Sequence, residues 1–258
     1  MMNLRKALIL SPNDPLAGEL VRAIQGGDLV SLQKMLAANP GLSAARITGN
    51  RGGSRALLHV VTDWPGFFPN GPAVVKLLIT TGSDPNARTE GREPRPEPDG
   101  ETPLQWAASS DDVEVAEALI LGGAVIEARG GSIAGGTALG NAIGYGCWRV
   151  ARLLLQHGAK VEKLWHAAAL GMTSMVERFF EGGLPPSREE LNDAFWQACS
   201  GGHRRTAEYL FARGADLNWV PSYAKGTPLE IATRAGMDTG RQALVEWLRA
   251  KGAQGDPK

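Results

Sequence analysis

Apolar residues recur along the chain in short runs, and each run closes at a glycine. Six such runs stand out, closing at Gly82, Gly123, Gly158, Gly183, Gly214 and Gly252. Within a run the apolar positions have helical spacing, as at Val115, Ala116, Leu119 and Ile120. A glycine behind such a run is typical of a helix C-terminus, where a positive φ costs little without a side chain. We therefore predict helices that end at these glycines.

A shorter segment rich in small residues precedes each run. These segments read LLHVVT, PLQWAAS, ALGNAIG, WHAAALG, FWQACSGG and PLEIATRAG. Two of them start at a Thr-Pro pair, Thr102-Pro103 and Thr227-Pro228, where threonine can cap a helix and proline fits the first helical position. Small residues allow close helix packing, and a single helix pair cannot bury both of its faces. The pattern predicts a helix–turn–helix unit that is stable only when stacked.

The repeat resembles the ankyrin repeat family, as in bacterial-type ankyrin repeat domain proteins, whose signature is T-P-L-H-x-A at a period of about 33 residues. The best matches are ETPLQWAASSDDVEVAEALILGGAVIEA, GTALGNAIGYGCWRVARLLLQHGAKVE and DAFWQACSGGHRRTAEYLFARGADLN. SDPNAR after Gly82 and ADLN after Gly214 are similar to the ADVN turn of the family. The resemblance implies an all-α fold, an α-solenoid of about seven stacked ankyrin-type repeats with short β-hairpin-like fingers.

This resemblance also sets the expected domain boundaries. We expect an N-terminal lead at 1–16, a single ankyrin repeat domain at 17–254 and a tail at 255–258. The expected units are 17–52, 53–89, 100–128, 135–162, 163–186, 187–219 and 225–254, with the first and last acting as caps.

Four places depart from the family pattern. Residues 64–74 form an insertion between the helices of the second unit, with prolines that cannot continue a helix. Residues 89–100 form a long charged connection that we expect to be solvated. The unit between Gly158 and Gly183 is short, which should interrupt the row of fingers, and GMDTGRQALVEWL stretches the last inter-helix turn.

The fourth position of the signature departs as well. The resemblance implies a histidine there that ties the Thr-Pro turn together by hydrogen bonds. In this chain the position holds, in order, His59, Gln105, Gly140, Trp165, Trp196 and Glu230. The sequence leaves the role of the replacements open.

Aromatic residues cluster at the first helices of the units, and we name Trp64, Trp106, Tyr145, Trp165 and Trp196 as candidates for partner binding. Trp106, Trp165 and Trp196 come from first helices, which line the concave groove in the ankyrin layout, so these three would form a stripe along it. Tryptophan and tyrosine give a large, rigid contact area and are frequent in binding hot spots. Alternatively, Trp165 and Trp196 fill gaps between stacked helices.

Polar residues fall near the ends of the same helices. Ser110, Asp111 and Asn141 complete the candidate partner-binding set. His59 and Asp63, four residues apart, would share a helix face, a geometry that suits a general base or half a metal site. An ordinary hydrogen bond that orients a turn is the favoured interpretation. No GxSxG, P-loop, HExxH or CxxC motif is present.

Composition narrows the choice of partners. The formal net charge is zero, which argues against a nucleic-acid binder. Cys147 and Cys199 are expected to be buried thiols of a reducing compartment. We find neither a secretory leader nor a stretch long enough to span a membrane, so we expect a soluble, cytoplasmic protein, compatible with a monomer, with no nucleic-acid or membrane partner.

Two functions remain. The first is a non-catalytic module that binds a protein or peptide through the groove and fingers, without metal or cofactor. The alternative is a small-molecule or hydrolytic pocket walled by residues 64–74, with His59 or His166 as the base and Asp63 or Asp111 as its partner.

Overall fold

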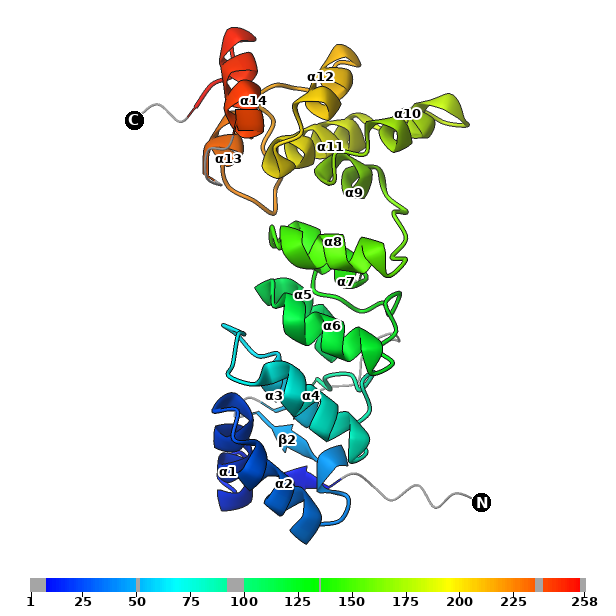
Figure 1. Ribbon diagram of the computed structural model, residues 1–258. Helices are drawn as coiled ribbons and strands as arrows, with labels where there is room; N and C mark the ends of the chain where they lie inside the picture. Colours follow the sequence, from blue (N-terminus) through cyan, green and yellow to red (C-terminus); the bar gives the residue numbers. More distant parts are fainter. Residues whose placement is uncertain (1–7, 50–51, 92–99, 135, 235–238, 256–258) are drawn as a thin grey trace. The chain divides into compact units, whose positions relative to one another are not determined.

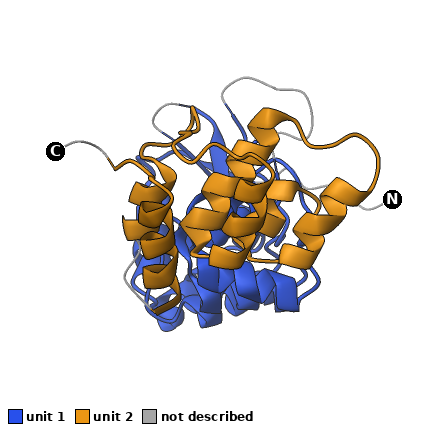
Figure 2. Cartoon of the chain, turned by 90° about the horizontal axis from the view of Figure 1, so that it is seen from above, with its two compact units in different colours: residues 1–160 blue, residues 161–258 orange. Residues whose placement is uncertain are grey.

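The computed structural model describes residues 8–49, 52–91, 100–134, 136–234 and 239–255. The chain divides into two compact units, Met1–Lys160 and Val161–Lys258, which Figure 2 colours separately. Each unit buries its own set of apolar side chains. None of the helices in the described ranges is long and apolar enough to cross a membrane.

The first unit consists of helix pairs stacked in two rows (Figure 1). The pairs are α1 (Pro15–Gln25) and α2 (Leu29–Ala38), α3 (Leu57–Val61) and α4 (Gly71–Thr80), α5 (Pro103–Ser110) and α6 (Val113–Leu121), and α7 (Ala138–Gly144) and α8 (Trp148–Gln156). The first helices of the pairs pack against one another, and so do the second helices. Fully buried alanines such as Ala107, Ala108 and Ala142 allow the helices of the first row to approach closely.

The second unit has the same plan. It contains α9 (Leu164–Ala169), α10 (Thr173–Glu181), α11 (Arg188–Gly201), α12 (Arg204–Ala212), α13 (Pro228–Arg234) and α14 (Thr239–Ala250). Its core surrounds Phe195, and Cys199 is buried in the same cluster as a free thiol. The predicted fold class is confirmed: ankyrin-type helical hairpins build the chain.

The glycines predicted to end helices do so. All six have a positive φ, between 83° and 114°, and each lies two residues beyond the last residue of a helix. Gly158 has no atom within 4 Å of where a Cβ would stand, so its conformation, rather than crowding, is what favours glycine there.

The ADVN-like turns connect successive units by side chain to main chain hydrogen bonds. Each turn supplies one oxygen to a backbone N–H of the next connection: Asn86 to Val125 at 2.7 Å, Glu127 to Lys160 at 2.9 Å, and Asn218 to Gln254 at 2.8 Å. Because the same contact recurs one unit further along, the repeat fixes its own spacing.

The sequence predicted only part of a small sheet near the N-terminus. It has the order β1-β2-β3, with β1 (Ile9–Leu10) parallel to β2 (Arg46–Thr48) and β2 antiparallel to β3 (Ser54–Ala56). The β2–β3 hairpin agrees with the finger expected for the first repeat, residues 17–52. Strand β1 comes from the predicted N-terminal lead, and η1 (Leu42–Ala44) precedes β2.

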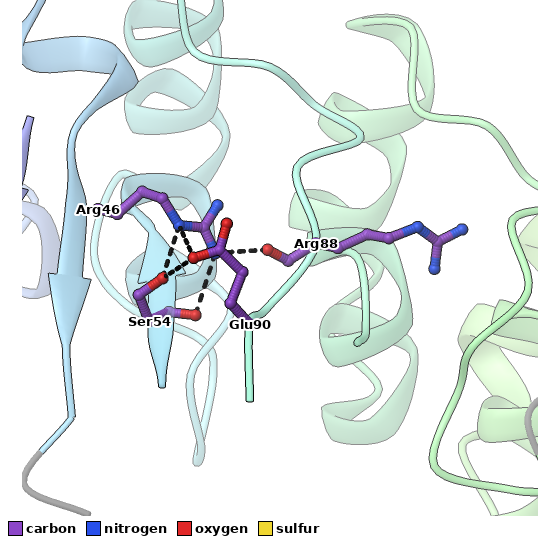
Figure 3. A network of polar contacts seen from close by, with 4 residues as sticks. All are labelled: Arg46, Ser54, Arg88 and Glu90. Atoms are coloured by element: carbon purple, nitrogen blue, oxygen red, sulfur yellow. Dashed lines mark hydrogen bonds and ion pairs between the residues drawn. The ribbon is translucent and has the colours of Figure 1, made fainter. Parts of the chain in front are cut away.

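The Arg46 guanidinium anchors this sheet to the following segment (Figure 3). Its Nε donates to Ser54 Oγ at 2.7 Å and lies 3.2 Å from the Glu90 carboxylate. Its Nη2 donates to the backbone carbonyls of Ser54, at 3.1 Å, and Arg88, at 2.6 Å. The guanidinium is thereby satisfied by acceptors from β3 and from residues 88–90, which follow α4.

The predicted insertion begins and ends differently from expectation. Helix α3 stops at Val61, and α4 already starts at Gly71, with Pro72 in its first turn, so the turn comprises residues 62–70. The predicted solvated connection lies mostly outside the described residues, at 92–99, and so do residues 235–238 of the last stretched turn.

Candidate functional site

The fourth signature position has a structural role even where histidine is replaced. In three units its side chain donates a hydrogen bond to the carbonyl just before the next first helix: His59 Nε2 to Glu101 at 2.9 Å, Gln105 Nε2 to Gly136 at 3.0 Å, and Trp196 Nε1 to Gly226 at 3.0 Å. Gln105 also forms a capping box with Thr102. Trp196 is only 6% exposed, so it fills a gap in the stack and offers no surface to a partner.

The predicted pair of His59 and Asp63 does not form. Because α3 ends at Val61, Asp63 lies beyond the helix, where its carboxylate pairs with Arg55 and accepts from the Trp64 N–H at 3.0 Å. His59 is fully buried, and its Nδ1 has no hydrogen-bond partner in the part of the chain described. Burial lowers the pKa of His59 to about 4, so the ring is neutral at neutral pH.

The other proposed acid–base residues, His166 and Asp111, belong to different units of the chain. His166 is buried in the second unit, where neither ring nitrogen has a hydrogen-bond partner among the described residues, and burial lowers its pKa to about 4. Asp111 lies in the first unit, at the end of α5 with φ 57°, and accepts from the Val150 N–H of α8 at 2.9 Å. The hydrolytic alternative is therefore left without a base in contact with a carboxylate.

Asn141 is an internal hydrogen-bonding centre and not a surface residue. It is fully buried, and its Nδ2 donates to Glu101 Oε1 at 2.8 Å and Ser109 Oγ at 3.2 Å. Its Oδ1 accepts from the Ile133 N–H at 3.2 Å. Asn141 thus holds the Glu101 carboxylate in place, and any effect on a partner is indirect.

Several predicted residues do meet, in one hollow of the first unit with a volume of about 230 Å³. We call it the aromatic hollow. Trp64 comes from the turn at 62–70, Trp106 from the middle of α5 and Tyr145 from the C-terminal end of α7. Trp64 is 83% exposed and Tyr145 is 54% exposed, whereas Trp106 is half-buried.

Polar groups complete its lining. The carboxylates belong to Asp63 and Glu101, and the hydroxyls to Thr62, Ser109, Ser110 and Ser132. Sequence reasoning missed Glu101 and Ser132. Glu101 stands directly before Thr102-Pro103, and that position is the signal by which it could have been found.

The turn at 62–70 forms one wall of the hollow and is held on two sides. The Phe67 N–H donates to Asp112 Oδ2 at 2.7 Å, and Asn70 Nδ2 donates to the Gly27 carbonyl at 3.0 Å. At Gly66 a Cβ would come within 3.0 Å of Ser110 Oγ, so the turn lies close against the end of α5. The described residues of this turn that line the hollow are Thr62, Asp63 and Trp64, so Trp64 is the only one of them that belongs to the wall expected at 64–74.

The second unit does not group its candidates in the same way. Its larger hollow, of about 660 Å³, lies at the N-termini of α10 and α12; its described lining includes Arg178, Arg204 and Arg205 but no tryptophan, tyrosine or phenylalanine and none of the predicted site residues. A smaller hollow of about 200 Å³ contains Trp219 and Tyr223, and its described lining also includes none of the predicted site residues. Trp165 is half-buried, with its ring 4.0 Å from that of His166. We therefore take the aromatic hollow as the candidate site.

A family model agrees with this architecture over part of the chain. Residues 67–163, which include α4 to α8, match the family model described as ankyrin repeats (3 copies). No curated protein matches the chain. Among solved structures, the ankyrin repeat domain of human ASB11 is similar, with 19% sequence identity and a TM-score of 0.49, over 93% of this chain and 99% of that chain.

Proposed function

The chain belongs to the ankyrin repeat family, and we propose that it is a non-catalytic protein that binds a protein or peptide partner through the aromatic hollow. Ankyrin repeats are generally protein–protein interaction modules. The observation that carries the proposal is the gathering of Trp64, Trp106 and Tyr145 in one hollow, two of them more than half exposed.

The size of the hollow favours a peptide side chain over a small molecule. Its volume of about 230 Å³ lies below the range of roughly 300–1,000 Å³ that is usual for small-molecule sites. A volume of this order accommodates one large side chain, while the rest of a peptide extends over the row of first helices. The wall at 62–70 and the bound Glu101 carboxylate are already in place, which reduces the entropy lost on binding.

Substitution of Trp64 gives the clearest test of this proposal. Its side chain is mostly in solvent, so Trp64→Ala removes contact area without opening a cavity in the core. A hot-spot aromatic contributes at least about 2 kcal/mol to binding, which corresponds to roughly a 30-fold loss of affinity. Phe67→Ala is a matched control, because Phe67 is an exposed aromatic residue of the same turn that does not line the hollow.

The experiment selects peptides from a displayed random library on the immobilised protein and then measures their affinities by titration. We expect selected peptides to bind Trp64→Ala and Tyr145→Ala at least about 30-fold more weakly than wild type, and Phe67→Ala with nearly unchanged affinity. Peptides that bind all three variants as tightly as wild type would show that the hollow is not the binding site.

A further inference from the structure

We propose that the side chain received by the aromatic hollow is an arginine of the partner peptide. The inference rests on the proposed function and specifies its partner. It follows from three properties of the lining: a carboxylate that has only neutral hydrogen-bond donors among the described residues, aromatic faces, and hydroxyl oxygens.

The carboxylate is that of Glu101. Its Oε1 accepts hydrogen bonds from the Ser132 N–H and from Asn141 Nδ2, both at 2.8 Å. Both donors are neutral, and no cationic side chain pairs with Glu101 within the described ranges of the chain. A half-buried carboxylate of this kind keeps its negative charge available to a ligand.

The neighbouring charged groups do not cancel the negative charge of Glu101. Asp63, the other carboxylate of the lining, is paired with Arg55, so these two charges offset each other. Among the residues that the structure describes, no lysine or arginine lines the hollow. The neighbouring His59 ring is neutral, because burial lowers its pKa to about 4. The hollow therefore favours a cation.

The aromatic side chains favour the same type of ligand. Cations bind over the faces of tryptophan and tyrosine rings, and the interaction is stronger when the site is partly desolvated. The orientation of Trp106 is restrained by His59, whose ring packs against it in a T-shaped arrangement at 5.0 Å. Trp64 and Tyr145 are the exposed aromatic residues at this site.

The acceptors distinguish arginine from lysine. The oxygens that can accept come from three segments of the lining: the Ser109 and Ser110 hydroxyls from the end of α5, the Ser132 hydroxyl, and the Glu101 carboxylate. Ser132 Oγ also lies 3.3 Å from the Tyr145 hydroxyl. A planar guanidinium presents five N–H donors in fixed directions, stacks on aromatic rings and is weakly hydrated. An ammonium group is a strongly hydrated point charge, for which a half-open aromatic hollow replaces less of the hydration.

The test uses three short peptides that differ in one side chain: acetyl-Gly-Arg-Gly-amide, its lysine counterpart and its citrulline counterpart. Citrulline has the shape of arginine without the charge. Binding is followed by the indole N–H resonances of Trp64 and Trp106 in spectra of the full-length, ¹⁵N-labelled protein, assigned with single variants. We expect the arginine peptide to shift both resonances, with a dissociation constant at least about tenfold lower than that of the lysine or citrulline peptide.

A pair of variants tests the role of Glu101. Glu101→Gln keeps an oxygen that can accept from Ser132 and Asn141 but removes the charge. We expect it to weaken arginine binding about tenfold. Glu127→Gln is the control, since Glu127 is also half-buried and also accepts a backbone N–H, at 2.9 Å, but lies outside the hollow.

Equal binding of the arginine and citrulline peptides, or equal losses in the two glutamine variants, would overturn the inference. Its failure is distinguishable from that of the proposed function. If library-selected peptides still require Trp64 but do not need arginine, only the present inference is wrong. If they do not require Trp64, the hollow is not the binding site.

Discussion

One carboxylate, that of Asp112, stabilises two segments at once. Its Oδ1 accepts from the Val115 N–H at 3.2 Å and so caps α6, while its Oδ2 accepts from the Phe67 N–H at 2.7 Å and so holds the wall of the aromatic hollow. Asp112 is 3% exposed, so water does not replace these bonds freely. Asp112→Ala removes both.

The expected cost combines two effects. Loss of an N-cap destabilises a protein by about 0.5–2 kcal/mol. Loss of a hydrogen bond to a charged, buried acceptor costs about 1.5–3 kcal/mol. Because the two effects share one side chain and are not strictly additive, we expect Asp112→Ala to lower the free energy of unfolding by about 2–4 kcal/mol.

Urea denaturation at neutral pH measures this loss, and Asp28→Ala is the matched control. Asp28 caps α2 through the Ser31 N–H at 3.0 Å but is exposed and holds no turn. Amide hydrogen exchange at Phe67 reports the wall directly: Asp112→Ala should accelerate it, and Asp28→Ala should leave it unchanged. If the two variants are equally destabilised and exchange at Phe67 is the same in both, Asp112 does not hold the wall.

Three further predictions concern the stack. Burial lowers the pKa of His59 from 6.5 to about 4, so between these values the unfolded chain binds a proton that the folded protein does not. The free energy of unfolding should therefore fall by about 3 kcal/mol as the pH decreases through this range. His59→Gln, which keeps a donor, should remove that part of the pH dependence. Urea denaturations that give the same pH dependence for wild type and His59→Gln would contradict this. Trp196→Phe deletes the donor to Gly226 and should destabilise the protein by about 1–3 kcal/mol in the same assay. It should not change the affinity of peptides that bind the aromatic hollow. A loss of affinity without a loss of stability would instead identify Trp196 as a partner-binding residue. Gly158→Ala should cost about 1–2 kcal/mol through its φ of 88° alone, and a neutral result would show that the turn adapts.

Local signals explain what the sequence predicted well. A glycine two residues beyond an apolar run reports a backbone conformation, and that conformation does not depend on distant contacts, which is why the helix ends were predicted correctly. The meeting of Trp64, Trp106 and Tyr145 has a related reason: stacked repeats bring the first helices of neighbouring units, and the turns that follow them, close together.

The errors concern features that depend on distant partners or on helix length. The pairing of His59 with Asp63 assumed that the helix continues, but α3 has only five residues. The internal roles of Gln105 and Trp196 depend on carbonyls of the following unit, about one repeat away, and no local pattern shows them. Glu101 was missed because its importance comes from a neutral hydrogen-bonding environment built by Asn141 and Ser132.

The central claim is that the aromatic hollow is where this protein receives its partner. The most direct measurement is a set of intermolecular nuclear Overhauser effects between a library-selected peptide and the full-length protein. The account predicts contacts from an arginine side chain of the peptide to the rings of Trp64, Trp106 and Tyr145. Contacts confined to other residues, such as those of the second unit, would contradict it.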